Sequence, residues 1–155
     1  MGDIKRNLLM STLIVKQFPK AKSALVIADG QGDLANRLAN KGLSCVVIEK
    51  KPRQNHVRKN VDYRSGVFSY LMKPILADVI VGMHPDEATA EIIRYAVKNK
   101  IPFAVCPCCV KGDAAKGVHG YMKWLNKLKS LAKGFDVYTL QLKMTGKNIV
   151  LVGKP

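Results

Sequence analysis

The chain has 155 residues, of which 48% are hydrophobic and 24% charged, a composition that is typical of a globular domain and excludes a wholly disordered or fibrous protein. The length suits a single domain over residues 1–155. Lysine and arginine number 26 against 11 acidic residues, so the formal net charge is +15 at pH 7 and a polyanion such as a nucleic acid is the first partner to consider.

The sequence favours a reduced, intracellular compartment. No apolar segment is long enough to cross a membrane, and the first residues lack the order of a signal peptide, so we expect no membrane contact. Three of the four cysteines lie within residues 106–109, too close together for ordinary disulfides among themselves. We therefore expect free thiols and a cytoplasmic or nuclear location.

The first part of the chain alternates helix and strand. Residues 1–19 hold a leading helix, predicted over about 4–18, because apolar residues recur at helical spacing until Pro19. An apolar strand at 23–28 runs into a glycine turn, then into a helix that stops at Gly42. A second strand over 43–48 ends on Glu49, and a basic polar segment follows it.

The alternation continues to the end of the chain. Further strands are predicted, in chain order, at 61–67, 77–82 and 101–105, which places the first five strands within 23–110. Helical spacing recurs at about 87–98 and 120–133. Within 120–155, the last helix precedes two strands at 135–142 and 148–152, whose short connection predicts a hairpin.

These elements predict an α/β fold. Apolar strands that alternate with helices form a parallel sheet whose two faces are both covered by helices, because the crossovers are right-handed. The sequence thus predicts one doubly wound, mostly parallel seven-stranded sheet with an antiparallel C-terminal hairpin strand at one edge.

The turn after the first strand has the composition of a nucleotide-binding loop. Gly30 and Gly32 let a ligand approach the backbone, and the next helix presents free N–H groups. Glu49, at the end of the second strand, is placed to accept the hydroxyls of a ribose. Because Gly30-x-Gly32-x-x-Ala35 also fits a dinucleotide fingerprint, NAD and S-adenosylmethionine both remain candidates, as does a turn that only packs strand on helix.

With this strand order and these glycines, the chain resembles the class I S-adenosylmethionine-dependent methyltransferases. The resemblance implies S-adenosylmethionine as cofactor and a set of binding residues, namely Asp29, Gly30, Gln31, Gly32, Asp33, Glu49, Lys50 and His84. Val26 stands where that family usually has an acid, so Asp29 and Asp33 are the acids expected to replace it. An NAD-linked oxidoreductase would need a further substrate domain.

The end of the fourth strand carries candidate catalytic groups. His84 is a candidate general base or substrate-orienting group, and Asp86 is a candidate proton acceptor or partner of the histidine. Asp86 and Glu87 also suit the start of the following helix, Asp86 as its cap.

The cysteines after the fifth strand allow two kinds of chemistry. Cys108 is a candidate catalytic thiol, and soft packing is the alternative role. The Cys-x-Cys-Cys spacing has no second ligand pair in the sequence, so no metal site is expected. Met83-His84 and Pro107-Cys108-Cys109 are similar to a branch of methyltransferase-like proteins with Leu-His after strand four and Pro-Cys-Cys after strand five, which includes enzymes that methylate tRNA ribose.

Basic residues follow the ends of several predicted strands. The candidate phosphate contacts are Lys51, Arg53, Arg58, Lys59, Lys111, Lys116, Lys123 and Lys127. The sequence therefore predicts a methyltransferase that acts on RNA, either tRNA or rRNA. The alternative is a non-catalytic module with this fold that binds RNA or a protein partner subunit.

Overall fold

The computed structural model describes residues 4–51, 53 and 58–155. They form one seven-stranded sheet with the order β3-β2-β1-β4-β5-β7-β6. The strands are β1 (Ser23–Ile27), β2 (Ser44–Glu49), β3 (Val61–Ser65), β4 (Val79–Met83), β5 (Phe103–Cys106), β6 (Asp136–Gln141) and β7 (Ile149–Lys154). β1 to β5 pair in parallel, whereas β7 is antiparallel to both β5 and β6, so the predicted fold class is confirmed.

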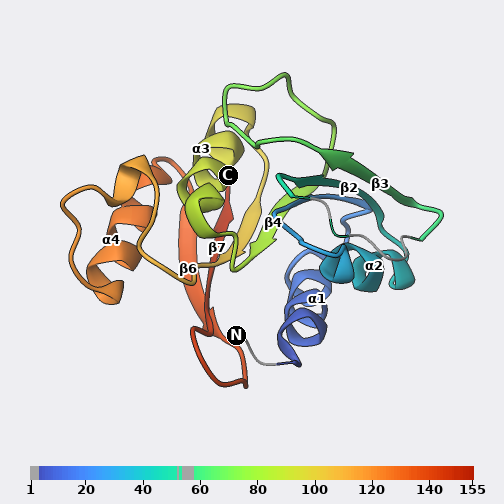
Figure 1. Cartoon of the computed structure of the whole chain (residues 1–155), viewed down its shortest axis with the longest axis horizontal. Helices are drawn as coiled ribbons and strands as arrows, with labels where there is room; N and C mark the ends of the chain where they lie inside the picture. Colours follow the sequence, from blue (N-terminus) through green and yellow to red (C-terminus); the bar gives the residue numbers. More distant parts are fainter. Residues whose placement is uncertain (1–3, 52, 54–57) are drawn as a thin grey trace.

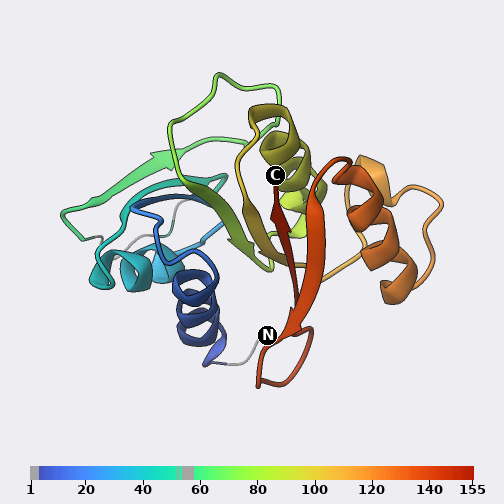
Figure 2. The same ribbon diagram turned by 180° about the vertical axis from the view of Figure 1, so that it is seen from behind.

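Helices cover both faces of this sheet. They are α1 (Arg6–Gln17), α2 (Asp33–Asn40), α3 (Thr89–Asn99) and α4 (Tyr121–Leu131), with short 3₁₀ turns η1 (Asp86–Ala88) and η2 (Asp113–Ala115). Figures 1 and 2 show α1 and α2 on one face and α3 and α4 on the other. Within the described part of the chain, none of the helices is long and apolar enough to cross a membrane.

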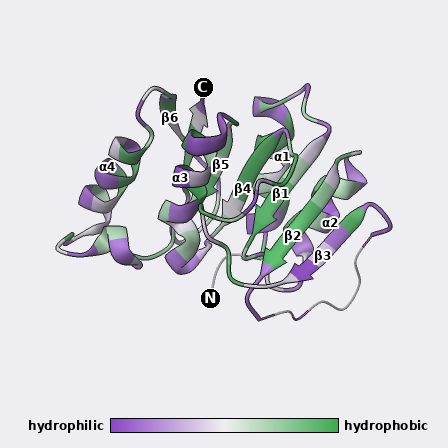
Figure 3. Cartoon of the chain, turned by 90° about the horizontal axis from the view of Figure 1, so that it is seen from above, coloured by the Kyte–Doolittle hydropathy of each residue, from purple (hydrophilic) through white to green (hydrophobic). Residues whose placement is uncertain are grey.

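Two apolar cores lie on either side of the sheet, because successive side chains of a strand point to opposite faces. Val26 and Val81 pack toward α1 and α2, whereas Leu25 and Ile80 pack toward α3 and α4. Figure 3 shows the central strands as hydrophobic and the edge strand β3 as largely hydrophilic. The continuous apolar runs of the central strands, rather than alternating ones, follow from burial on both faces.

The sheet reverses its strand order beside β1. β1 lies between β2 and β4, so the chain first extends the sheet toward β3 and then crosses back to β4 on the other side. The connections after β1 and β4 therefore leave the sheet in opposite directions. A crevice forms between them at the carboxyl ends of the strands, where doubly wound folds bind ligands.

The leading helix packs differently from the sequence pattern. Leu8 is one of the apolar residues at helical spacing, yet it is 45% exposed, and α1 buries Met10, Ser11 and Ile14. Ser11 satisfies its hydroxyl by donating to the Leu8 carbonyl. α1 has apolar residues on several sides, so its contacts with α2 and β4 decide its rotation rather than its own periodicity.

A close contact between β5 and β7 gives a test of this packing. A Cβ added to Gly153 would lie 2.1 Å from Cε1 of Phe103, which is fully buried. Overpacking of this kind costs about 1–3 kcal/mol, so Gly153→Ala should lower the free energy of unfolding by that amount in urea titrations. Gly66→Ala is the control, because a Cβ there meets nothing within 4 Å, and equal stability losses in both variants would contradict the contact.

Candidate functional site

A cavity of about 610 Å³ lies in the crevice at the carboxyl ends of β1 to β4. Its wall combines apolar side chains, acidic groups and basic groups. The described residues that line it are Ile27, Ala28, Ile48, Glu49, Lys50, Lys51, Arg53, Gly66, Val67, Phe68, Pro85, Asp86, Glu87, Ala88, Ala90, Glu91, Arg94, Gly112, Asp113 and Ala114. This size and mixed lining are those of a small-molecule site.

Hydrogen bonds from β2 and β3 fix the glycine turn at one end of the cavity. The Gly30 N–H donates to Oε2 of Glu49 at 2.8 Å, and the Lys51 N–H donates to Oε1 of the same carboxylate at 3.0 Å. The Tyr63 hydroxyl donates to the Gly30 carbonyl. Glu49 thus orients the turn and still lines the cavity, since a carboxylate has lone pairs for more than two hydrogen bonds.

The backbone leaves β1 through an unusual conformation. Ala28, the first residue after the strand, has a φ of +59°, and Gly30 and Gly32 also have positive φ. A non-glycine residue rarely adopts this region. The conformation turns the chain sharply away from the sheet, so that Ala28 itself borders the cavity.

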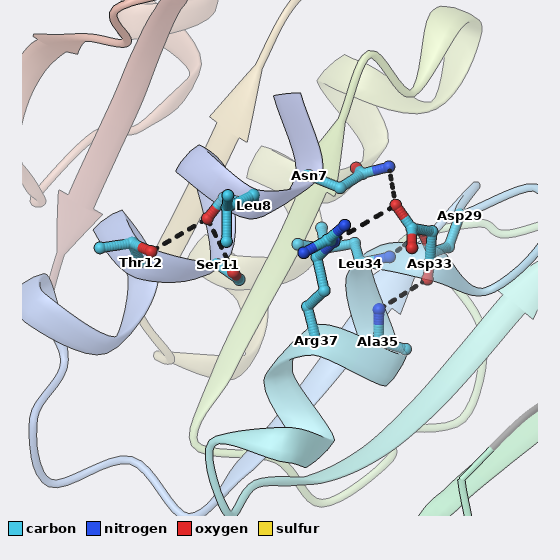
Figure 4. Close-up of polar contacts among 9 residues, drawn as sticks. All are labelled: Asn7, Leu8, Ser11, Thr12, Asp29, Asp33, Leu34, Ala35 and Arg37. Carbon is cyan, nitrogen blue, oxygen red and sulfur yellow. Dashed lines mark hydrogen bonds and ion pairs between the residues drawn. The ribbon is translucent and has the colours of Figure 1, made fainter. Parts of the chain in front are cut away.

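Asp29 anchors the start of α2, as Figure 4 shows. Its carboxylate accepts the Leu34 N–H at 3.0 Å and the Ala35 N–H at 2.8 Å, two donors that have no partner within the helix. Burial, opposed by these two hydrogen bonds, raises the pKa of Asp29 to about 7, and the charges of Asp33 and Glu49 add to the rise. Asp29 is thus a structural group of the turn.

The predicted cofactor residues fall into three groups: two that line the cavity, five in the glycine turn, and His84. Glu49 and Lys50 line the cavity, where Lys50 forms a 3.1 Å ion pair with Glu87. The five residues of the turn, Asp29, Gly30, Gln31, Gly32 and Asp33, are not among its lining residues. Asp33 faces α1 instead, where it accepts from Asn7 at 2.8 Å and pairs with Arg37 (Figure 4).

His84 lies outside the cavity and has both ring nitrogens engaged. Its Nε2 is 2.8 Å from the Lys147 carbonyl, which can only accept, and its Nδ1 is 3.5 Å from the Arg6 guanidinium, which can only donate. These contacts assign the neutral form with the proton on Nε2. Burial, aided by the charge of Arg6, lowers the pKa of His84, so the ring is held neutral between α1 and the β6–β7 connection.

Asp86 contacts the cysteines rather than capping the next helix. The expectation that it caps is wrong, because α3 and η1 begin without a side-chain capping hydrogen bond. Instead its Oδ1 lies 3.1 Å from Cys108 Sγ and 3.3 Å from Cys109 Sγ. Burial acts to raise the pKa of Asp86, but the two thiol hydrogen bonds and the charge of Lys111 lower it.

The environment of Cys108 opposes its predicted role as a nucleophile. Burial, with hydrogen bonds to Cys109 and Asp86, raises the pKa of the Cys108 thiol to about 12. Nucleophilic cysteines have a lowered pKa, because the thiolate is the reactive form. As a free thiol, Cys108 is therefore in the unreactive form at neutral pH.

The predicted basic contacts do not form one patch. Lys51 and Arg53 border the cavity, and Arg53 Nη2 would lie 3.5 Å from a Cβ placed on Gly30. Lys59 lines a second hollow, at the opposite edge of the sheet, beside the start of β1 and β2. Arg58 precedes it, and its N–H donates to Asn36. Between them, residues 52 and 54–57 lie outside the described residues.

The remaining predicted basic residues follow β5. Lys111 and Lys116 flank η2, and Lys123 and Lys127 lie exposed on α4. The Tyr121 hydroxyl, at the start of α4, donates to the Pro107 carbonyl, so α4 begins at the cavity edge of the sheet. Trp124 is fully buried and is not available to stack on a base.

Sequence reasoning missed much of the cavity wall. Val67 and Phe68 follow β3, and Glu91 and Arg94 come from α3, where they pair at 3.6 Å. A signal for the first two was present: all parallel strands end at the same edge, so residues after β3 had to lie near Glu49. No comparable signal existed for α3, because the rotation of this helix about its axis depends on packing.

Known proteins are similar to this chain in fold but not in sequence. No protein-family model matches the chain, and no curated protein is significantly similar to it. Among solved structures, PigF with S-adenosylhomocysteine (SAH) is 14% identical with a TM-score of 0.59, and the alignment covers 95% of this chain and 55% of PigF. The N-terminal domain of EvdMO1 with SAH bound is 15% identical, with a TM-score of 0.65 and coverage of 98% and 82%.

A third similar structure is the sugar N-methyltransferase KedS8 from Streptoalloteichus sp., at 12% identity and a TM-score of 0.64, with coverage of 97% and 87%. The chain spans only about half the length of three of the similar structures, PigF among them. At these identities the likeness concerns the fold alone. The chain thus has a fold similar to that of solved structures described as methyltransferases.

The raised pKa of Asp29 predicts a pH effect on stability. Between its ordinary pKa of 3.8 and about 7, the folded chain holds a proton that the unfolded chain has lost, so stability should fall as pH rises through this window. From pH 5 to pH 8, urea unfolding should show the wild type losing about 2 kcal/mol relative to Asp29→Asn. Parallel pH profiles of the two proteins would contradict this assignment.

Proposed function

We propose that the chain binds S-adenosylmethionine in the cavity at the carboxyl ends of β1 to β4 and transfers its methyl group. The observation that carries the proposal is the position of Glu49, which lines this cavity while it holds the glycine turn through the Gly30 N–H. The similar structures with SAH bound, PigF and EvdMO1, support the same cofactor.

The residues present fit this cofactor. Glu49 would accept the ribose hydroxyls, and the apolar side chains of Ile48, Val67 and Phe68 offer a surface for the adenine. Gly66 leaves open space beside them, since nothing lies within 4 Å of a Cβ built there. Arg53, beside Gly30, is placed to pair with the carboxylate of the methionine part.

Transfer of a methyl group from this cofactor depends little on acid–base groups of the protein. S-adenosylmethionine supplies an activated methyl group to a nucleophile on the substrate. The chain has to bind the cofactor, orient the acceptor and exclude competing water. The neutral His84 lies outside the cavity with both ring nitrogens engaged, so it fits a structural role between α1 and the β6–β7 connection rather than that of a free base.

We also propose that the methyl acceptor is part of an RNA. The net charge of +15 favours a polyanion. Lys51 and Arg53 line the cavity, and Lys111 and Lys116 flank η2, whose residues Asp113 and Ala114 also line it. Phosphate contacts by such residues position a nucleic acid without reading its sequence. Two of the similar structures are named for small substrates, a mitomycin 7-O-methyltransferase and a sugar N-methyltransferase, so a small acceptor is the outcome that would replace RNA.

Calorimetric titration with S-adenosylmethionine, SAH and NAD tests the cofactor. We expect micromolar binding of the first two and none of NAD. Gly66→Trp should abolish binding, because the side chain fills the cavity without a backbone clash, and Gly66→Ala should preserve it. Glu49→Gln should weaken binding at least about tenfold, the effect of losing a charge-assisted hydrogen bond.

A folded wild-type chain that binds neither S-adenosylmethionine nor SAH would overturn the proposal and favour the non-catalytic module. Asp62→Asn is the matched control for Glu49→Gln, because Asp62 lies exposed on β3, where it pairs with Arg64. Circular dichroism of each variant separates loss of binding from loss of folding.

The RNA proposal predicts a salt-dependent affinity. Reversal of Lys111, Lys116 and Lys123 to glutamate should weaken binding of a tRNA and lower the slope of log affinity against log salt by about one for each lost phosphate contact. Reversal of Lys20 and Lys41, exposed at the opposite edge of the sheet, is the control and should leave the slope nearly unchanged. Equal effects of the two sets would argue against a footprint at the cavity.

A further inference from the structure

Three potential metal ligands converge beside the cavity, from the ends of two adjacent strands. Oδ1 of Asp86 lies 3.1 Å from Cys108 Sγ and 3.3 Å from Cys109 Sγ, and the two sulfur atoms are 3.2 Å apart. One ligand atom from each residue therefore lies within 4.8 Å of the others. We infer that Asp86, Cys108 and Cys109 bind one zinc ion.

The chemistry of the donors selects the metal. Two thiolates and one carboxylate suit zinc, because sulfur ligands disfavour magnesium and calcium. With Zn–S near 2.3 Å and Zn–O near 2.0 Å, tetrahedral zinc holds two sulfur ligands roughly 3.8 Å apart and a sulfur and an oxygen roughly 3.5 Å apart. The sulfur atoms must therefore separate by about half an ångström, which rotation of the cysteine side chains supplies.

The backbone around the site holds the ligands together. Asp86 has a φ of +51°, which few non-glycine residues adopt, and this conformation aims its carboxylate at the thiols. Gly112, in the loop after β5, packs closely on Glu87, the residue that follows Asp86. A Cβ added to Gly112 would lie 3.1 Å from the Glu87 carbonyl. The Tyr121 hydroxyl fixes the Pro107 carbonyl just before the cysteines. The loops after β4 and β5 are thus tied together at the site.

The position of the site indicates what the metal does. Three protein ligands leave one position of a tetrahedral zinc open, as in catalytic rather than structural zinc sites. Asp86 is exposed and lines the cavity, so the open position lies beside the cavity wall and takes water or a donor atom of the substrate. Three anionic ligands leave the complex with one negative charge, which the nearby Lys111 offsets.

Cobalt titration tests the site without any use of activity. The reduced, metal-free chain should bind one Co²⁺, with the intense visible bands of a tetrahedral complex and a near-ultraviolet band from thiolate-to-cobalt charge transfer, and Zn²⁺ should displace it. Cys108→Ser and Cys109→Ser should each weaken metal binding by more than the roughly 10–100-fold typical of second-shell changes. Asp86→Asn should weaken it as well and keeps the backbone conformation, because asparagine tolerates positive φ.

Matched controls are Cys45→Ala, which removes a thiol buried on β2, and Asp113→Asn, which removes an exposed acid of the same cavity. Both should bind cobalt like the wild type. A cobalt spectrum without the charge-transfer band, or cysteine variants that bind as well as the wild type, would overturn the inference. SAH titration of the metal-free chain tests the proposed cofactor binding separately. The zinc site and the cofactor site can therefore each be disproved without the other.

Discussion

The parallel pairing of β1 to β5 is the constraint on which the rest of the molecule depends. Each parallel connection must return across a face of the sheet, so helices cover both faces and all five carboxyl ends meet at one edge. Residues as distant in sequence as Glu49, Phe68 and Asp86 become neighbours for this reason alone. The cavity is the gap that opens where the strand order reverses beside β1.

Polar side chains at this edge have two tasks. Glu49 lines the cavity and also ties the glycine turn to β2. Asp29, whose pKa is raised by burial, holds the first turn of α2. The turn is therefore fixed before any ligand arrives, and a ligand does not have to order it. Such preorganisation lowers the entropy cost of binding.

Backbone strain is concentrated at the same edge. Of the four described non-glycine residues with positive φ, three lie there: Ala28 follows β1, and His84 and Asp86 follow β4. The fourth, Lys100, ends α3. Conformations of this kind persist only where the surrounding structure enforces them, and they cluster at functional sites. Here the two buried cores on either side of the sheet hold the strands, and the strained residues direct the chain around the cavity and toward Cys108 and Cys109.

The sequence by itself determined the order of the elements, the mostly parallel sheet and the position of Glu49 at a strand end, because apolar runs, glycines and strand lengths are local signals. It did not determine the buried side of α1, the split of the basic residues 50–59 between two edges, or the outward turn of His84 toward Arg6 and Lys147. The sequence placed Asp86 and the cysteines after two successive parallel strands, but it did not determine that the carboxylate of Asp86 turns toward the thiols of Cys108 and Cys109. Tertiary packing decided these features, because they depend on contacts between elements, and only the fold brings such residues together.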